Sequence, residues 1–69
     1  VSSAEDFKVH RGDVGTVRTA LRPAGRAVFF GEVYDVVAEG EFIEPRESVV
    51  ITEISGNRIV VARMRPDAQ

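Results

Sequence analysis

The sequence predicts an all-β fold, a small barrel built from five short strands. Short runs in which apolar and polar side chains alternate recur along the chain, a pattern typical of half-buried strands. Glycine, proline and asparagine separate these runs at regular intervals. No segment has a convincing helical pattern. With 69 residues the chain is long enough for one domain.

The alternation predicts which side of each strand faces the core. In the first strand the core side carries Val17, Thr19 and Leu21, and in the third strand Tyr34 and Val36 share one face. For so short a chain, a five-stranded, partly open, OB-like β-barrel is the natural way to close the sheet. The expected strands cover residues 14–21, 26–30, 33–38, 48–54 and 58–64.

Glycines and prolines predict the geometry of the connections. Gly15 lies inside the first strand and indicates a bulge or a sharp bend. In the next turn Pro23 fixes φ and Gly25 tolerates a positive φ. Gly56 and Asn57 form a hairpin turn in which both residues suit a positive φ.

Composition limits the chemistry of the chain. The net charge is −2, whereas a nucleic-acid-binding domain is usually basic. There is no cysteine and His10 is the only histidine, so we expect no Cys/His metal site and no cofactor. His10 lies in a polar segment with nothing to place it beside a serine and a carboxylate, so no catalytic triad is expected. The sequence therefore predicts a protein that is not an enzyme.

The longest connection, residues 39–47, is rich in carboxylates. Phe42 and Ile43 lie within it and are expected to point inwards. The carboxylates match no calcium-loop spacing, so a solvated acidic loop is the simpler interpretation. Docking on a basic partner is the second possibility. The acidic residues are Glu39, Glu41, Glu44 and Glu47.

The aromatic residues of the central strands give the other candidate surface. Phe29 and Phe30 are consecutive and must point to opposite faces of a strand, so at least one belongs to the core. If Phe30 faces outwards, its exposed ring beside Gly31 indicates a partner-binding site, with Arg22 and Arg26 as further contact candidates. The alternative is a single-stranded nucleic-acid-binding OB domain, in which aromatic and arginine side chains line a groove.

Two long segments carry a family resemblance. LRPAGR at residues 21–26 and GEVYDVVAEGEFI at residues 31–43 resemble the C-terminal soluble domain of the NfeD family, and the similarity extends from about Gly12 to Met64. One departure is Pro45-Arg46-Glu47, where the family usually has a glycine. The chain is thereby divided into a flexible lead-in at residues 1–12, the OB-like domain at residues 13–65 and a tail at residues 66–69.

The resemblance also implies a setting. Members of the NfeD family have hydrophobic membrane segments before this domain and act with stomatin- or flotillin-like membrane proteins. The chain has no apolar run of spanning length, and its abrupt start at Val1 looks like an excised fragment. We therefore expect a domain of a cell-membrane protein that faces the cytoplasm and contacts the membrane only through segments outside this chain. An open strand edge leaves a homo-oligomer possible.

Overall fold

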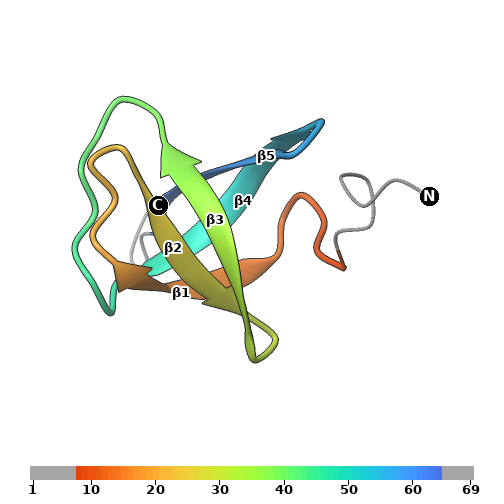
Figure 1. Ribbon diagram of the computed structural model, residues 1–69, viewed down its shortest axis with the longest axis horizontal. Coiled ribbons are helices and arrows are strands. Elements are labelled where there is room, and N and C mark those ends of the chain that lie inside the picture. The colour runs from red at the N-terminus through yellow and green to blue at the C-terminus, as the bar shows by residue number, and fades with distance from the viewer. Residues whose placement is uncertain (1–7, 65–69) are drawn as a thin grey trace.

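The computed structural model describes residues 8–64, and all regular structure within them is β-strand (Figure 1). The sheet is continuous and twisted, and its order is β1-β2-β3-β5-β4, with β4 returning to β1 to close the barrel. The strands are β1 (Val14–Thr19), β2 (Ala24–Phe29), β3 (Glu32–Ala38), β4 (Ser48–Ser55) and β5 (Arg58–Arg63). The predicted five-stranded OB-like barrel is confirmed.

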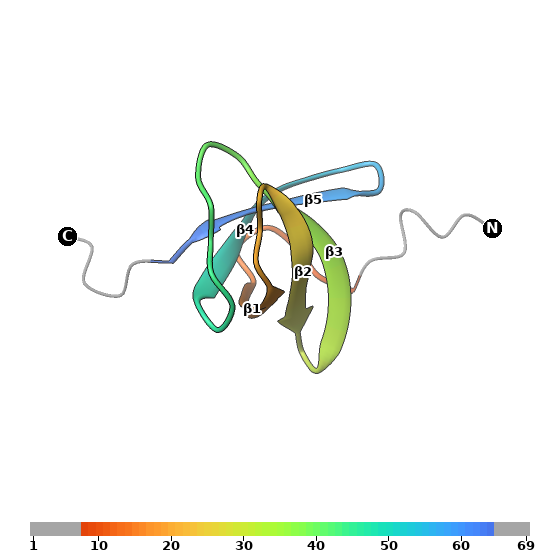
Figure 2. The ribbon, with the colours of Figure 1, turned by 60° about the vertical axis from the view of Figure 1, so that its left-hand side comes forward.

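Neighbouring strands pair antiparallel except where β3 meets β5. That parallel pairing is short and joins Val36–Ala38 of β3 to Ile59–Val61 of β5. The segment 39–47 crosses one end of the barrel between β3 and β4 (Figures 1 and 2). The barrel is therefore closed by few hydrogen bonds between β3 and β5, whereas β2 and β3 pair over six positions.

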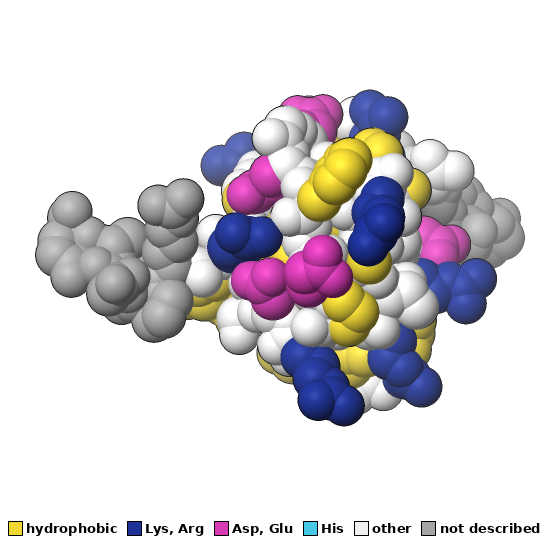
Figure 3. Space-filling model, turned by 90° about the vertical axis from the view of Figure 1, so that its left-hand side faces the viewer, with side chains coloured by type: hydrophobic (Ala, Val, Ile, Leu, Met, Phe, Trp, Pro, Cys, Tyr) yellow, Lys and Arg dark blue, Asp and Glu magenta, His cyan; other side chains and the backbone are white. Residues whose placement is uncertain are grey.

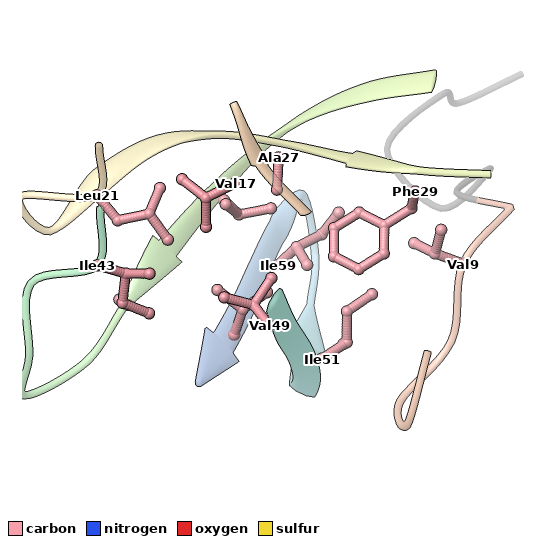
Figure 4. Packing of buried hydrophobic residues seen from close by; sticks show 12 residues of the cluster. Val9, Val17, Leu21, Ala27, Phe29, Ile43, Val49, Ile51 and Ile59 are labelled. Carbon is pink, nitrogen blue, oxygen red and sulfur yellow. The ribbon is translucent and has the colours of Figure 1, made fainter. Parts of the chain in front are cut away.

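The core is entirely apolar among the described residues. At one end Leu21 and Ile43 meet, and at the other the ring of Phe29 points towards Val9 (Figure 4). Tyr34 packs against the same cluster, with its ring edge-on to Phe29 at 6.1 Å between centroids. The prediction that Tyr34 faces the core is confirmed, and of the Phe29-Phe30 pair it is Phe29 that is buried.

The first strand departs from the predicted alternation at Thr19. The register of β1 against β2 shifts between Val17 and Thr19, so the side chain of Thr19 turns outwards and is exposed. Its Oγ1 accepts a hydrogen bond from the backbone N–H of Arg26, at 3.0 Å. The prediction that Thr19 faces the core was wrong because a bulge changes the side on which later residues lie. Leu21 is buried, as expected.

Two glycines have a different role from the predicted one. A Cβ on Gly15 would lie 2.4 Å from the carbonyl oxygen of Val28 and 2.6 Å from the ring of Phe29. A Cβ on Gly25 would lie 2.5 Å from the carbonyl oxygen of Ala20, and Gly25 has no positive φ. Close packing of neighbouring segments therefore requires these glycines. The bulge lies two residues beyond Gly15, after Val17.

The two tight hairpins differ in type. Phe30 and Gly31 both have positive φ, 55° and 81°, as a type I′ turn requires. In the β4–β5 turn only Gly56 has positive φ, 61°, which fits a type II′ turn. The expectation for Gly56 is confirmed, whereas that for Asn57 was wrong.

The segment that departs from the family pattern forms a turn at Glu44–Glu47. The N–H of Glu47 donates to the carbonyl oxygen of Glu44 at 3.3 Å, and Arg46 has φ of 75°. Pro45 at the second position and a positive φ at the third fit a type II turn. Arg46 thus occupies a conformation that favours glycine.

Residues 8–13 lie against the barrel. Val9 is buried. The N–H of Gly12 donates to the carbonyl oxygen of Ile51, and the N–H of Ile51 donates to the carbonyl oxygen of Asp13. This part of the predicted lead-in is therefore attached to β4 and the core. The rest of the lead-in, and the tail at 66–69, lie outside the described residues, and the domain boundaries stay predictions.

Candidate functional site

Phe30 is the most exposed large apolar residue of the described chain. Its side chain is 72% exposed at the tip of the β2–β3 hairpin, whereas the neighbouring Phe29 is fully buried. Phe30 also has a positive φ, which is costly for a bulky residue. Neither burial nor turn geometry explains a phenylalanine at this position, which is typical of a residue retained for contact with another molecule.

Near the hairpin tip that carries Phe30, apolar side chains lie on the outside of the barrel. Val28 faces outwards near the end of β2, and the direct neighbours of Val28 across the sheet are Val33 on β3 and Thr16 on β1. Val33 is 47% exposed. A second row begins at Val14, two residues before Thr16 on β1.

Val14 extends this surface towards β4. It is 45% exposed and pairs directly with Val50, which is half-buried. The outer face of a barrel strand normally carries polar residues, because only the inner face is removed from water. We call the surface made by Val14, Val28, Phe30, Val33 and Val50 the outer apolar face.

Sequence reasoning found only Phe30 of this set. Valine at outward strand positions was the available signal. However, the pairing of Val14 with Val50 joins residues far apart in the chain, and only the sheet register brings them together.

Arg26 borders the outer apolar face. It lies two residues before Val28 on β2, and its Nε donates to Oδ1 of the cross-strand neighbour Asp35 at 3.1 Å. Both side chains are mostly exposed, so the ion pair contributes little to stability. With Asp35 and Arg58, Arg26 also lines a shallow hollow of about 380 Å³ between the β1–β2 and β4–β5 connections.

Arg22 lies at the other end of β2 from Phe30. Six residues of strand separate the two turns, which corresponds to roughly 20 Å. The Arg22 guanidinium lies 4.0 Å from Glu44 Oε2, with both side chains exposed. The structure therefore separates the predicted contact residues: Phe30 lies at one end of β2, Arg22 with Glu44 lies at the other, and Arg26 lies midway between them.

Arg63 ties the acidic connection to β5. Its backbone N–H donates to Glu41 Oε2 at 3.1 Å, and its guanidinium donates to the carbonyl oxygen of Phe42 at 2.9 Å. Arg63 Nε lies 3.1 Å from Glu47 Oε1, as an ion pair in which the N–H is not directed at that oxygen. The carboxylates of Glu41 and Glu47 thus hold the loop against β5 through Arg63. Sequence reasoning did not identify Arg63.

The loop's apolar residues point in opposite directions. Ile43 is buried, as expected, and it forms an isolated bridge with Leu21. Phe42 is 64% exposed, so the expectation that it points inwards was wrong. This connection is neither a strand nor a helix, so its side chains do not alternate regularly and the sequence does not predict which of them point inwards. Phe42, Pro23 and Glu41 line a second shallow hollow at this end.

The charges at this end are mixed. Figure 3 shows the side covered by residues 39–47, where basic and acidic side chains alternate around separate apolar patches. Glu39, the remaining predicted contact residue, is exposed on the same loop. Among residues 8–64, no group of three or more His, Cys, Asp or Glu side chains is placed to hold a metal ion.

A closed barrel of five strands with the order β1-β2-β3-β5-β4 and an apolar outer face defines a small OB-like interaction domain. Residues 10–63 match the family described as the NfeD-like C-terminal, partner-binding domain, and the chain belongs to this family. No curated protein matches it. Within the described residues there is no helix long and apolar enough to cross a bilayer.

A solved structure supports the same assignment. The chain is similar to the C-terminal domain of stomatin operon partner protein 1510-C from Pyrococcus horikoshii, with 30% identity and a TM-score of 0.76. The similarity covers 80% of this chain and 88% of that domain. The family resemblance inferred from the sequence is therefore confirmed.

Proposed function

We propose that this domain is a non-catalytic binding module of a membrane-anchored protein, and that it binds a stomatin- or flotillin-like membrane protein through the outer apolar face. The observation that carries the proposal is Phe30, an aromatic side chain that is 72% exposed and held at positive φ. Burial of a phenylalanine side chain is worth roughly 2 kcal/mol, which a partner gains only by covering it.

The anatomy of the surface supports this assignment. The outer apolar face includes the half-exposed Val14 and Val33 as well as Phe30, and the Arg26–Asp35 ion pair lies beside it. Interfaces commonly have such an apolar centre and polar rim. The similarity to a stomatin operon partner protein supports the partner class. We place the domain on the cytoplasmic side of the cell membrane, with the anchor outside this chain.

A binding role without catalysis agrees with the placement of His10. Its side chain is exposed, and its backbone N–H donates to Asp13 Oδ2 at 2.7 Å. Three of the four carboxylates of the acidic loop, Glu41, Glu44 and Glu47, contact Arg63 or Arg22. Neither group is arranged with a nucleophile and a base within the described residues, as acyl transfer requires.

A single-stranded nucleic acid is the second candidate partner. OB barrels bind such strands over β2, β3 and the β1–β2 and β4–β5 connections, where the hollow lined by Arg26 and Arg58 lies. However, Arg26 is paired with Asp35, and no described aromatic side chain lines the hollow. We therefore expect any binding to single-stranded DNA to be weak, and steeply lowered by salt because it depends on phosphates.

The test compares two exposed phenylalanines. A stomatin-family protein from the same organism, purified in detergent, is immobilised, and binding of wild type, Phe30→Asn and Phe42→Asn is measured. We expect Phe30→Asn to weaken binding at least tenfold and Phe42→Asn to leave it nearly unchanged. Loss of binding only with Phe42→Asn would move the site to the end with Arg22, Glu39, Glu41 and Glu44, which are still predicted contacts. No binding by wild type would refute the proposed partner.

A further inference from the structure

We propose that the partner binds as an added β-strand on the free edge that β3 presents at Glu32, Val33 and Asp35. This inference rests on the proposed partner-binding function and specifies the chemistry of the bound segment. It follows from the unequal pairing of β3 on its two sides, from the side chains beside the free edge and from the charges that flank it.

The two sides of β3 differ in how far they are paired. Towards β2, the ladder is regular over six positions, from Phe29↔Glu32 to Ala24↔Val37. Towards β5, pairing is confined to Val36–Ala38. Among the described residues, the first half of β3 therefore has no strand on that side. In Figure 1 the lower half of β3 runs away from β5 towards the hairpin tip.

The backbone of Val33 is directed at this free side. The tight turn at Phe30-Gly31 makes Phe29 and Glu32 a hydrogen-bonded pair, because a two-residue type I′ hairpin ends in such a pair. Backbone groups alternate in direction along an antiparallel strand. The N–H and C=O of Val33 therefore point away from β2, where an added strand would bond to them.

Free edges are usually protected against pairing by proline, lysine or a bulge. Residues 32–35 of β3 contain no proline or lysine, and the β2–β3 register is regular there. The protective feature that remains is charge, since Glu32 and Asp35 flank Val33 and both are exposed.

These charges select the occupant. A second copy of this chain pairing through the same edge would place carboxylates against carboxylates, which disfavours a symmetric dimer. Asp35 already has Arg26 at 3.1 Å, whereas Glu32 forms no ion pair among the described residues. A partner segment with a basic side chain beside Glu32 complements this edge.

The outer apolar face specifies the neighbouring position. Side chains of an added strand alternate between the two faces of the sheet, so those beside Val33 extend the row formed by Val28 and Val33. Phe30 is exposed in the turn that precedes β3, close to the start of this edge. We therefore infer an extended segment in which apolar residues, facing Val33 and Phe30, alternate with polar residues, at least one of them basic.

The experiment measures amide hydrogen exchange of the domain by NMR, free and bound to the purified stomatin-family protein. We expect the Val33 amide to exchange rapidly in the free domain and at least tenfold more slowly in the complex. The Val37 amide, which faces β5 in the paired half of β3, is the internal reference for an amide protected in both states.

Two variants separate the backbone from the side chain. Val33→Ala keeps the N–H and should retain most binding, whereas Val33→Pro removes the N–H and should abolish it without removing a β2–β3 hydrogen bond. Glu32→Lys should weaken binding at least threefold, because it places a positive charge beside the basic residue of the partner. This variant tests the inference even if Val33→Pro does not fold.

Each other outcome overturns the inference in a distinguishable way. Binding that depends on Phe30 but leaves Val33 exchange unchanged would refute strand addition and leave the proposed function intact. Protection of Val33 in the free domain would show that the edge is already covered, and protection that grows with domain concentration would identify a second copy. Absence of binding would refute the proposed function itself.

Discussion

Phe29 and Phe30 are adjacent in the chain, but one side chain is fully buried and the other is 72% exposed. Phe29 fills the end of the barrel beside Val9, and Phe30 begins the turn that follows. The first residue contributes to folding. The second occupies a conformation that asparagine or glycine adopts at lower cost, and most of its surface is exposed.

Replacement of Phe30 by asparagine should therefore stabilise the domain while it weakens partner binding. Relief of the positive φ should raise the free energy of unfolding by up to about 1 kcal/mol. In a domain of this size this corresponds to roughly 4–8 °C in Tm, measured by circular dichroism. Phe42→Asn is the matched control, because Phe42 is also exposed but has no positive φ. A fall in Tm for Phe30→Asn would mean that the ring stabilises the folded state.

Gly15 is the position where the smallest side chain should do the greatest harm. The Cβ of Gly15→Ala would overlap the carbonyl oxygen of Val28 and the buried ring of Phe29, neither of which is a flexible chain end. We expect a loss of about 2–3 kcal/mol in the free energy of unfolding, measured by urea denaturation. Gly40→Ala is a useful comparison because its Cβ meets nothing within 4 Å, and its cost comes from the positive φ alone. Equal losses in the two variants would contradict the close approach at Gly15.

Arg46 offers a stabilising change at the site where the family usually has a glycine. Its φ of 75° favours glycine, so Arg46→Gly should raise the free energy of unfolding by roughly 0.5–1 kcal/mol. Arg46→Ala removes the same guanidinium but keeps the unfavourable φ, so it should give no gain. If alanine stabilises as much as glycine, the effect comes from the arginine side chain and not from the backbone.

The sequence predicted those parts of the fold that depend on alternation and on turn residues. These include all five strands, the inward Tyr34 and the opposite directions of Phe29 and Phe30, one of which belongs to the core. It failed at Thr19 because a bulge reverses the alternation, and at Phe42 because an irregular connection has no period. Both failures concern single backbone positions whose geometry is set by contacts with other segments.

The candidate site was less predictable than the fold. The sequence named Phe30 as its centre only on the condition that Phe30 faces outwards, and the structure shows that it does. Its extent depends on register, since Val14 meets Val50 and Val28 meets Val33 only across the sheet. Arg22 and Arg26 are near each other in sequence, yet Arg22 pairs with Glu44 of the loop whereas Arg26 pairs with Asp35 across the β2–β3 ladder.

Arg63 should be the arginine that contributes most to the stability of the loop at residues 39–47. It is only about one-third exposed, it donates to the carbonyl oxygen of Phe42 and it pairs with Glu47. Arg63→Ala leaves that carbonyl and the Glu47 carboxylate without their cationic partner, and we expect a loss of about 1–2 kcal/mol. Arg22→Ala is the control, because its contact with Glu44 is 4.0 Å long and exposed, and its loss should cost less than about 0.5 kcal/mol. Thermal unfolding measures the loss of stability in both variants. The rate of amide exchange at residues 41–47 should rise only in Arg63→Ala. Similar losses for both arginines would show that Arg63 does not have this special role.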